Sequence, residues 1–279
     1  MINHLVGIEY GRGACAVARD GGPALAPQAV RKMFPNATWD IITPEPFNAA
    51  EIAADRFAEN TKIQKKIYAA TPRTRHILIG GDHSVNFGHF AALADAAASD
   101  LCLIYIDAHL DIHTPESSRA QASGAPHGTN VRALLGDGDA RWHALQTKRP
   151  ALRPENLFYL GTRSYERAEI DFARDQDIFI RTPDALKTAT DCRAIVDEIK
   201  SRIAGRPYVV SFDFDAIDPK YFRDVWVPEP NGIDAATAEF LVREFAPNAH
   251  GFEFVEYAPN GDAASANLVK TLVGIALND

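Results

Sequence analysis

Eight short apolar runs alternate with segments of helical periodicity along the whole chain, and this alternation limits the possible folds more than any other feature. Runs of this length read as buried strands, and strands separated by helices pair in parallel. The sequence therefore predicts an α/β fold, a parallel sheet with helices on both faces. The expected strands are residues 5–8, 39–43, 76–79, 101–106, 157–161, 177–180, 208–212 and 251–255.

Between these runs, apolar residues recur at the spacing of one helix face. The expected helices are residues 27–34, 50–70, 85–97, 167–175, 192–203, 235–245 and 263–277. No Gly/Ser-rich linker, repeat or low-complexity segment interrupts the 279 residues. The chain is therefore predicted to form a single domain, residues 1–279.

Composition and charge exclude several classes of function. Hydrophobic residues make up 46% of the chain and no apolar stretch reaches the length of a membrane span. A net charge of -8 argues against a nucleic acid or an anionic membrane as partner. The first residues read as a strand and not as a signal peptide, so the cytoplasm is the expected compartment. Cys15, Cys102 and Cys192 are widely spaced and are expected to be reduced.

The run at residues 101–106 ends in three side chains that can bind a metal, Asp107, His109 and Asp111. Residues at i, i+2 and i+4 of a strand share one face, so these three can converge just past the end of the strand. A single Asp-x-His-x-Asp motif is explained equally well by turn aspartates and a polar histidine. Two other segments decide between these interpretations.

Two further strand ends carry side chains of the same kind. Asp213 and Asp215 follow the run at 208–212, and His83 follows the run at 76–79 after a Gly-Gly turn. Two divalent ions can share four carboxylates and two imidazoles through bridging oxygens, whereas one ion cannot. Ligation by oxygen and imidazole without thiolate favours manganese. The sequence therefore predicts two Mn²⁺ ions bound by His83, Asp107, His109, Asp111, Asp213 and Asp215.

Three motifs, in this order and spacing, resemble the signatures of the ureohydrolase superfamily of arginase, agmatinase and formiminoglutamase, and most of all its arginase-like branch. They are Gly80-Gly-Asp-His-Ser84, Asp107-Ala-His-Leu-Asp111 and Ser211-Phe-Asp-Phe-Asp-Ala-Ile-Asp-Pro219. The resemblance implies the arginase-like fold, a doubly wound eight-stranded parallel sheet, and a binuclear manganese centre. Similar proteins form trimers or hexamers, which leaves a homo-oligomer open because the sequence itself does not decide it.

The resemblance also implies three catalytic residues. The polar loop at 112–128 is long for a compact α/β domain, and it ends in His127, where arginases and agmatinases carry a histidine assigned to proton transfer. A solvated loop histidine is the plain alternative. Glu256 resembles the carboxylate of the family's Glu-x-Asn-Pro motif, which holds the guanidinium through two parallel hydrogen bonds. Asp111 is implied to bind metal and to accept a hydrogen bond from the attacking hydroxide.

The resemblance is weaker at the residues that would contact the rest of the substrate. Glu166 stands where arginases use an Asp for the α-amino group, although a carboxylate at a helix N-terminus explains it nearly as well. Ser123 is retained, but His113 and Ala125 replace two asparagines that contact the substrate's carboxylate. Trp226 lies in a segment that departs from the family's glycine-rich sequence, and we expect it to narrow the mouth of the site.

The expected function is that of a binuclear manganese amidinohydrolase. Its substrate would be a small guanidino compound, either arginine, a modified arginine or a related molecule, cleaved to urea and an amine. A formiminoglutamase or agmatinase-type hydrolase of the same superfamily is the alternative. A metallophosphoesterase is less favoured because its Gly-Asn-His-Glu/Asp motif is absent from the sequence. A non-catalytic relative is less favoured because all six ligand positions are retained.

Overall fold

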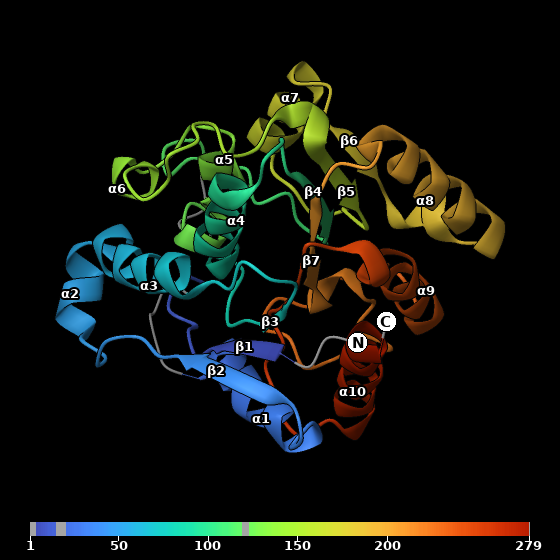
Figure 1. Cartoon of the computed structure of the whole chain (residues 1–279), viewed down its shortest axis with the longest axis horizontal. Coiled ribbons are helices and arrows are strands. Elements are labelled where there is room, and N and C mark those ends of the chain that lie inside the picture. The colour runs from blue at the N-terminus through green and yellow to red at the C-terminus, as the bar shows by residue number, and fades with distance from the viewer. Residues whose placement is uncertain (1–3, 15–20, 119–122, 279) are drawn as a thin grey trace.

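One sheet of eight parallel strands, in the order β2-β1-β3-β8-β7-β4-β5-β6, forms the centre of the protein (Figure 1). The computed structural model describes residues 4–14, 21–118 and 123–278. The strands are β1 His4–Ile8, β2 Thr38–Ile42, β3 Ile77–Ile79, β4 Cys102–Ile106, β5 Leu157–Leu160, β6 Phe179–Arg181, β7 Tyr208–Asp213 and β8 Gly251–Val255.

All eight predicted strands are present, and seven of them differ from the prediction by at most one residue at either end. The exception is β6, which begins at Phe179 and not at Asp177. Asp177 has φ 51, in the left-handed region, where a residue cannot continue an extended strand. This residue forms a turn after the preceding helix, and the strand starts beyond it.

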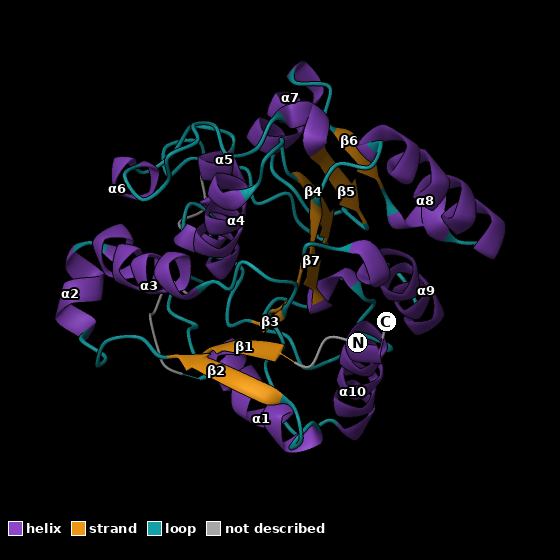
Figure 2. Ribbon diagram, in the orientation of Figure 1, coloured by secondary structure: helices purple, strands orange, loops and turns teal. Residues whose placement is uncertain are grey.

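The residues of each central strand alternate between two hydrophobic cores, one on each face of the sheet. In β4, Cys102 and Ile104 pack in the core of one face, whereas Leu103 and Tyr105 pack in the core of the other. This follows from the two-residue period of a strand. Helices cover both faces, as the doubly wound prediction requires (Figure 2).

The first of these cores contains residues of α1 Ala26–Met33, α8 Ala189–Ile203, α9 Ala235–Phe245 and α10 Ala263–Asn278. The opposite core contains residues of α4 Val85–Ala96, α5 Asn130–Leu134, α6 Ala140–His143 and α7 Arg167–Asp175. A smaller core joins β1 to α3 Arg56–Ala70. Helices α5 and α6 were not predicted, because their four or five residues are too short to show helical periodicity.

The predicted helix at residues 50–70 is wrong as a single element. The structure has two helices there, α2 Ala49–Ala54 and α3 Arg56–Ala70, which are separated at Asp55. Asp55 is extended, and its carboxylate accepts a hydrogen bond from the backbone N–H of Ala58 at 2.9 Å. An aspartate that caps a helix in this way starts a new one, although the apolar spacing continues across it.

Within the described residues, no helix is both long enough and apolar enough to cross a membrane. Cys102 and Cys192 are buried free thiols, in agreement with the prediction, and Cys15 lies outside the described residues.

Candidate metal centre and active site

The four strands in the middle of the sheet deliver the candidate site residues to one edge. Strands β3, β8 and β4 are followed by His83, Glu256 and Asp107 respectively, and β7, which lies between β8 and β4, ends in Asp213. Because all four strands are parallel, their carboxyl ends lie side by side. Residues that are far apart in sequence therefore meet at the predicted place.

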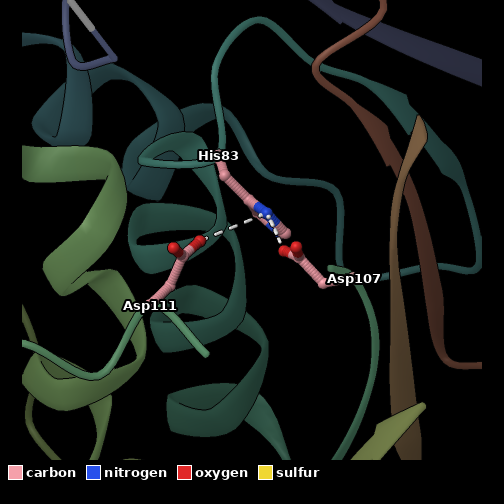
Figure 3. A group of neighbouring side chains, drawn as sticks. All are labelled: His83, Asp107 and Asp111. Atoms are coloured by element: carbon pink, nitrogen blue, oxygen red, sulfur yellow. Dashed lines mark ion pairs between the residues drawn. The ribbon is translucent and has the colours of Figure 1, made fainter. Parts of the chain in front are cut away.

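The first group of candidate ligands surrounds Nδ1 of His83. This nitrogen lies 2.8 Å from Oδ2 of Asp107, 3.0 Å from Oδ2 of Asp213 and 3.5 Å from Oδ2 of Asp111. Figure 3 shows the imidazole of His83 between the carboxylates of Asp107 and Asp111. All four side chains are buried, so one nitrogen and three carboxylate oxygens face one another away from solvent.

The second group surrounds Nδ1 of His109. It lies 3.0 Å from Oδ2 of Asp215 and 3.4 Å from Oδ1 of Asp107. Asp107 therefore contributes one oxygen to each group, and its Oδ2 is buried without a hydrogen-bond partner among the described residues. A carboxylate shared in this manner fits a bridge between two divalent cations, which take oxygen and imidazole ligands.

The electrostatics of the site also fit cations. Burial and the charge of Asp107 raise the pKa of Asp111 to about 7. Burial opposes the charge of His83 and His109, but the neighbouring carboxylates outweigh it and raise the pKa of both imidazoles. The protein alone thus places more negative charge here than a buried site tolerates, and protons on these groups compensate for it. Divalent cations would replace those protons.

The surrounding residues hold Asp111 and His83 in place. The Tyr105 hydroxyl donates to Oδ2 of Asp111 at 2.8 Å, and its ring stacks on the imidazole of His83 with centroids 4.3 Å apart. Asp111 itself has φ 52, a conformation that non-glycine residues seldom adopt. Backbone strain of this kind persists where the surrounding structure imposes it, and it is concentrated at functional sites.

His127 lies in a short 3₁₀ helix, Pro126–Thr129, and lines the same cavity. Its Nδ1 lies 2.9 Å from the carbonyl oxygen of Gly13, which can only accept, so Nδ1 carries the proton. Nε2 is then the nitrogen that remains for other partners. Burial lowers the pKa of His127 to about 4, so the ring is neutral at neutral pH.

Glu256 lies immediately beyond β8 and is also buried. Its Oε1 accepts a hydrogen bond from the backbone N–H of His83 at 2.8 Å, which ties it to the first ligand group. Burial, followed by the charges of Asp213 and Asp82, raises the pKa of Glu256 well above its usual value. With φ 62 it is a second non-glycine residue of the site in the left-handed region.

A cavity of about 140 Å³ opens above the two ligand groups. His83, His109, Asp111, Asp213 and Asp215 contribute to its lining. The remaining lining side chains are candidates for substrate contact, and they are Ala14, His113, Ser123, His127, Glu169, Val225, Val227 and Glu256. The cavity is therefore acidic near the ligands and partly apolar elsewhere.

A family model described as the arginase family matches residues 4–277, and these residues include every part of the site. The chain belongs to the arginase family. The resemblance to the ureohydrolase superfamily is thereby confirmed.

Among curated proteins, the arginase of Entamoeba histolytica is 28% identical over 188 residues, covering 66% of this chain and 62% of that protein. The arginase of Staphylococcus aureus is 31% identical over 164 residues, covering 57% of this chain and 52% of that protein. The matches thus span little more than half the length of these two relatives.

Two solved structures share the fold of this arginase-family chain. An arginase from Bacillus subtilis superposes with a TM-score of 0.84 at 23% identity, covering 100% of this chain and 99% of that one. A formimidoylglutamase from the same species superposes with a TM-score of 0.77 at 19% identity, covering 99% and 87%. Two activities therefore occur on this fold, and the site residues must discriminate between them.

Two of the residues predicted to contact substrate do not line the cavity of the arginase-family site. Trp226 is not among the described residues that line the cavity, because its indole packs against Gly22, where an added Cβ would lie 2.0 Å from the ring. Val225 and Val227, its neighbours, line the cavity instead. Glu166 is also outside the lining, since it is the N-cap residue of α7.

Sequence reasoning missed Glu169, which is buried and lines the cavity in place of Glu166. Its carboxylate accepts a hydrogen bond from the backbone N–H of Glu166 at 2.9 Å and lies 3.3 Å from Nε2 of His113. The signal was present in the sequence, because Glu166 and Glu169 have the three-residue spacing of a capping box. Ser123 and His113, which were predicted, do line the cavity.

Proposed function

We propose that this chain is a binuclear manganese amidinohydrolase that cleaves the guanidino group of an arginine-like compound to urea and an amine. The observation that carries the proposal is Asp107, whose two oxygens belong to two imidazole–carboxylate groups at the floor of one cavity. Glu256 and His127 line the same cavity. Membership of the arginase family supports the reaction class.

The proposed ligands are His83, Asp107, Asp111 and Asp213 for one ion, and Asp107, His109 and Asp215 for the other. Six ligands with no thiolate suit Mn²⁺ better than Zn²⁺. When bound, two such cations would supply a strong nucleophile at neutral pH by lowering the pKa of water. The expectations of a homo-oligomer and of a cytoplasmic location stay predictions.

Glu256 is proposed to bind the guanidinium. A buried carboxyl group with a raised pKa gains its charge when a cation arrives, and a planar guanidinium offers it parallel N–H donors. The hydrogen bond from the backbone N–H of His83 orients the carboxyl group toward the ligand groups. Glu256 thus positions the carbon to be attacked above the floor of the cavity.

His127 is proposed to move the proton that cleavage requires. Its Nδ1–H is committed to the carbonyl of Gly13, so a neutral ring offers Nε2 as the base. Nε2 accepts a proton from the attacking nucleophile. It then donates this proton to the departing amine, which leaves as a neutral product. Because the pKa of His127 is about 4 before substrate binds, Nε2 is unprotonated at neutral pH.

The residues around the substrate's tail favour a compound other than unmodified L-arginine. The methyl side chain of Ala125 has no hydrogen-bonding group, and the buried Nε2 of His113 lies 3.3 Å and 3.4 Å from Glu169 and Glu166 respectively. Burial opposes the charge of His113, but Glu169 outweighs it and raises its pKa. A small cavity with this composition fits a guanidine with a shortened, hydroxylated or otherwise modified tail.

Product release by the Mn²⁺-loaded protein tests the proposal. Urea is measured for arginine, agmatine and shorter guanidino acids, hydroxyurea for N-hydroxylated arginine, and formamide for formiminoglutamate. We expect urea from at least one guanidino compound. The Glu256→Gln variant should lose a few kcal/mol of transition-state binding for that compound, at least a hundredfold in kcat/KM. Faster cleavage of formiminoglutamate than of every guanidine, or an unchanged Glu256→Gln variant, would replace this proposal by the formimino alternative.

A further inference from the structure

A chain of buried polar side chains leads away from the candidate metal ligand His83. Its Nε2, on the far side of the ring from the carboxylates, lies 2.8 Å from Oγ of Ser211. The Ser211 hydroxyl donates to Oε2 of Glu253 at 2.6 Å, and the Asn86 amide donates to the same oxygen at 2.8 Å. All four side chains are almost completely inaccessible to solvent.

The chain continues through two histidines to the start of β3. Oε1 of Glu253 pairs with Nδ1 of His89. Nε2 of His89 lies 2.7 Å from Nε2 of His76, and Nδ1 of His76 lies 2.8 Å from the carbonyl oxygen of Thr74. The two imidazoles meet edge to face at 83°. An unbroken hydrogen-bonded path therefore connects the candidate metal centre with the opposite end of the β3 segment.

The fold explains why these groups meet. Ser211 and Glu253 are direct partners in the pairing of β7 with β8. Asn86 and His89 are three residues apart on α4, so they face the same side of that helix. Glu253 is a fully buried carboxylate within a central strand, where an unpaired charge would be strongly destabilising. Three polar atoms surround its carboxylate, from Asn86, His89 and Ser211, and the site proposed above uses none of them.

Counting protons along the path assigns the charge of each ring. Thr74 offers a carbonyl, so Nδ1 of His76 must donate. Burial lowers the pKa of His76 to about 3, so this ring is neutral and its Nε2 accepts. Nε2 of His89 must then donate to His76, and the contact of Nδ1 with Oε1 of Glu253 holds one further proton. With that proton on Nδ1, the two side chains form an ion pair.

Glu253 is correspondingly an anion. Burial opposes its charge, but His89, Ser211 and Asn86 outweigh burial and lower the pKa of Glu253. As an anion it can only accept, so the Ser211 hydroxyl points to it and the Ser211 oxygen accepts from Nε2–H of His83. Nδ1 of His83 is then the nitrogen that faces the carboxylates and would exchange its proton for a cation.

We propose that the buried His89–Glu253 ion pair is a positioning device that fixes, through Ser211, which nitrogen of His83 is free to bind a cation. This inference rests on the metal centre of the proposed function, but not on its substrate. His89 touches neither candidate ligand group. His89 acts through the direction of two successive hydrogen bonds, from Ser211 to Glu253 and from His83 to Ser211.

The test is the affinity of the 279-residue protein for Mn²⁺ at pH 8, measured through the electron paramagnetic resonance signal of the free ion. In a His89→Gln variant, Glu253 loses its counter-charge, takes up a proton and can donate to Ser211. The hydrogen bonds to His83 then reverse. We expect one of the two ions to bind about ten- to a hundredfold more weakly and the other to bind unchanged. His143→Gln, which removes a histidine remote from the path, is the matched control.

Wild-type affinity for both ions in the His89→Gln variant would overturn the inference, as would an equal loss of both. A second measurement needs no variant. Nitrogen NMR of the histidine rings in Zn²⁺-loaded wild-type protein should show His89 protonated on both nitrogens and His83 on Nε2. A neutral His89 at pH 8 would also overturn it. Neither readout depends on urea release. A protein that binds two ions but releases no urea would therefore contradict the proposed function and leave this inference intact.

Discussion

Replacing Asp107 by Asn tests the shared carboxylate on which the proposed centre depends. Oδ1 of Asp107 accepts a hydrogen bond from the backbone N–H of His109 at 2.7 Å, and the amide oxygen of an Asn can retain this bond. The amide nitrogen then replaces Oδ2, 2.8 Å from Nδ1 of His83. An amide nitrogen donates and does not bind a cation, so the fold is kept and the bridge is lost.

The size of the effect follows from the geometry. Asp107 lies within 3.4 Å of the ligating nitrogen of each group, so its charge acts on both ions at short range. One unit charge at about 4 Å contributes about 4 kcal/mol at an effective dielectric constant of about 20. Since 1.4 kcal/mol corresponds to a factor of ten, this energy limits the loss of affinity for each ion to about three orders of magnitude. We expect both ions to bind about a hundred- to a thousandfold more weakly.

The assay combines elemental analysis of the purified protein with titration by Mn²⁺. Asp215→Asn is the informative comparison, because Asp215 contributes only to the second group and should weaken one ion. Asp218→Asn is the control. It lies in the same sequence motif, but its carboxylate accepts from the backbone N–H of Lys220 and belongs to neither group. An Asp107→Asn variant that binds both ions normally, or that loses only one, would refute the bridge.

Three further predictions follow from individual residues. His127→Ala should lower kcat about a hundredfold or more while elemental analysis finds the metal content unchanged; loss of metal would mean that His127 is a ligand. Val227→Ala should change the ranking of guanidino substrates measured as kcat/KM, whereas Trp226→Ala, outside the cavity lining, should lower the melting temperature without changing that ranking. Because the folded pKa of His76 is depressed to about 3 from 6.5, its contribution to stability is present above pH 6.5 and is lost as the pH falls toward 3. Urea denaturation should therefore show a stability slope of about 1.4 kcal/mol per pH unit from this residue, and His76→Gln should flatten the curve.

The sequence predicted the elements of the fold well where a long pattern repeats. Apolar runs identified all eight strands. The five strands β3, β4, β5, β7 and β8 are buried along their whole length, which makes their sequences continuously hydrophobic. The structure divides the helix predicted at residues 50–70 into two. The reason is that the carboxylate of Asp55 accepts a hydrogen bond from the backbone of the next turn and caps a new helix there. A single cap is a weak signal beside twenty residues of matching periodicity.

Some residues of the candidate site could likewise be proposed from the sequence, whereas the orientation of others could not. His83, Asp107, His109 and Asp215 could be proposed from the sequence because each lies within four residues of the end of a strand, and parallel strands end at one edge. Trp226 could not be oriented from the sequence, since neighbouring residues of a loop point in directions set by the segments that they pack against. Here those segments include Gly22, about two hundred residues earlier in the chain.

What the sequence determined by itself is therefore the α/β class, the strands and the chemical character of their carboxyl ends, all of which depend on residues close together in the chain. The tertiary structure alone decided the tautomer of His127, which Gly13 sets from 114 residues away, and the partner of His89 Nδ1, which is Glu253 at a separation of 164 residues. The physical reason is that a hydrogen bond inside a protein depends on which donor and acceptor are brought together. Only the packing of helices on the sheet brings these groups into contact.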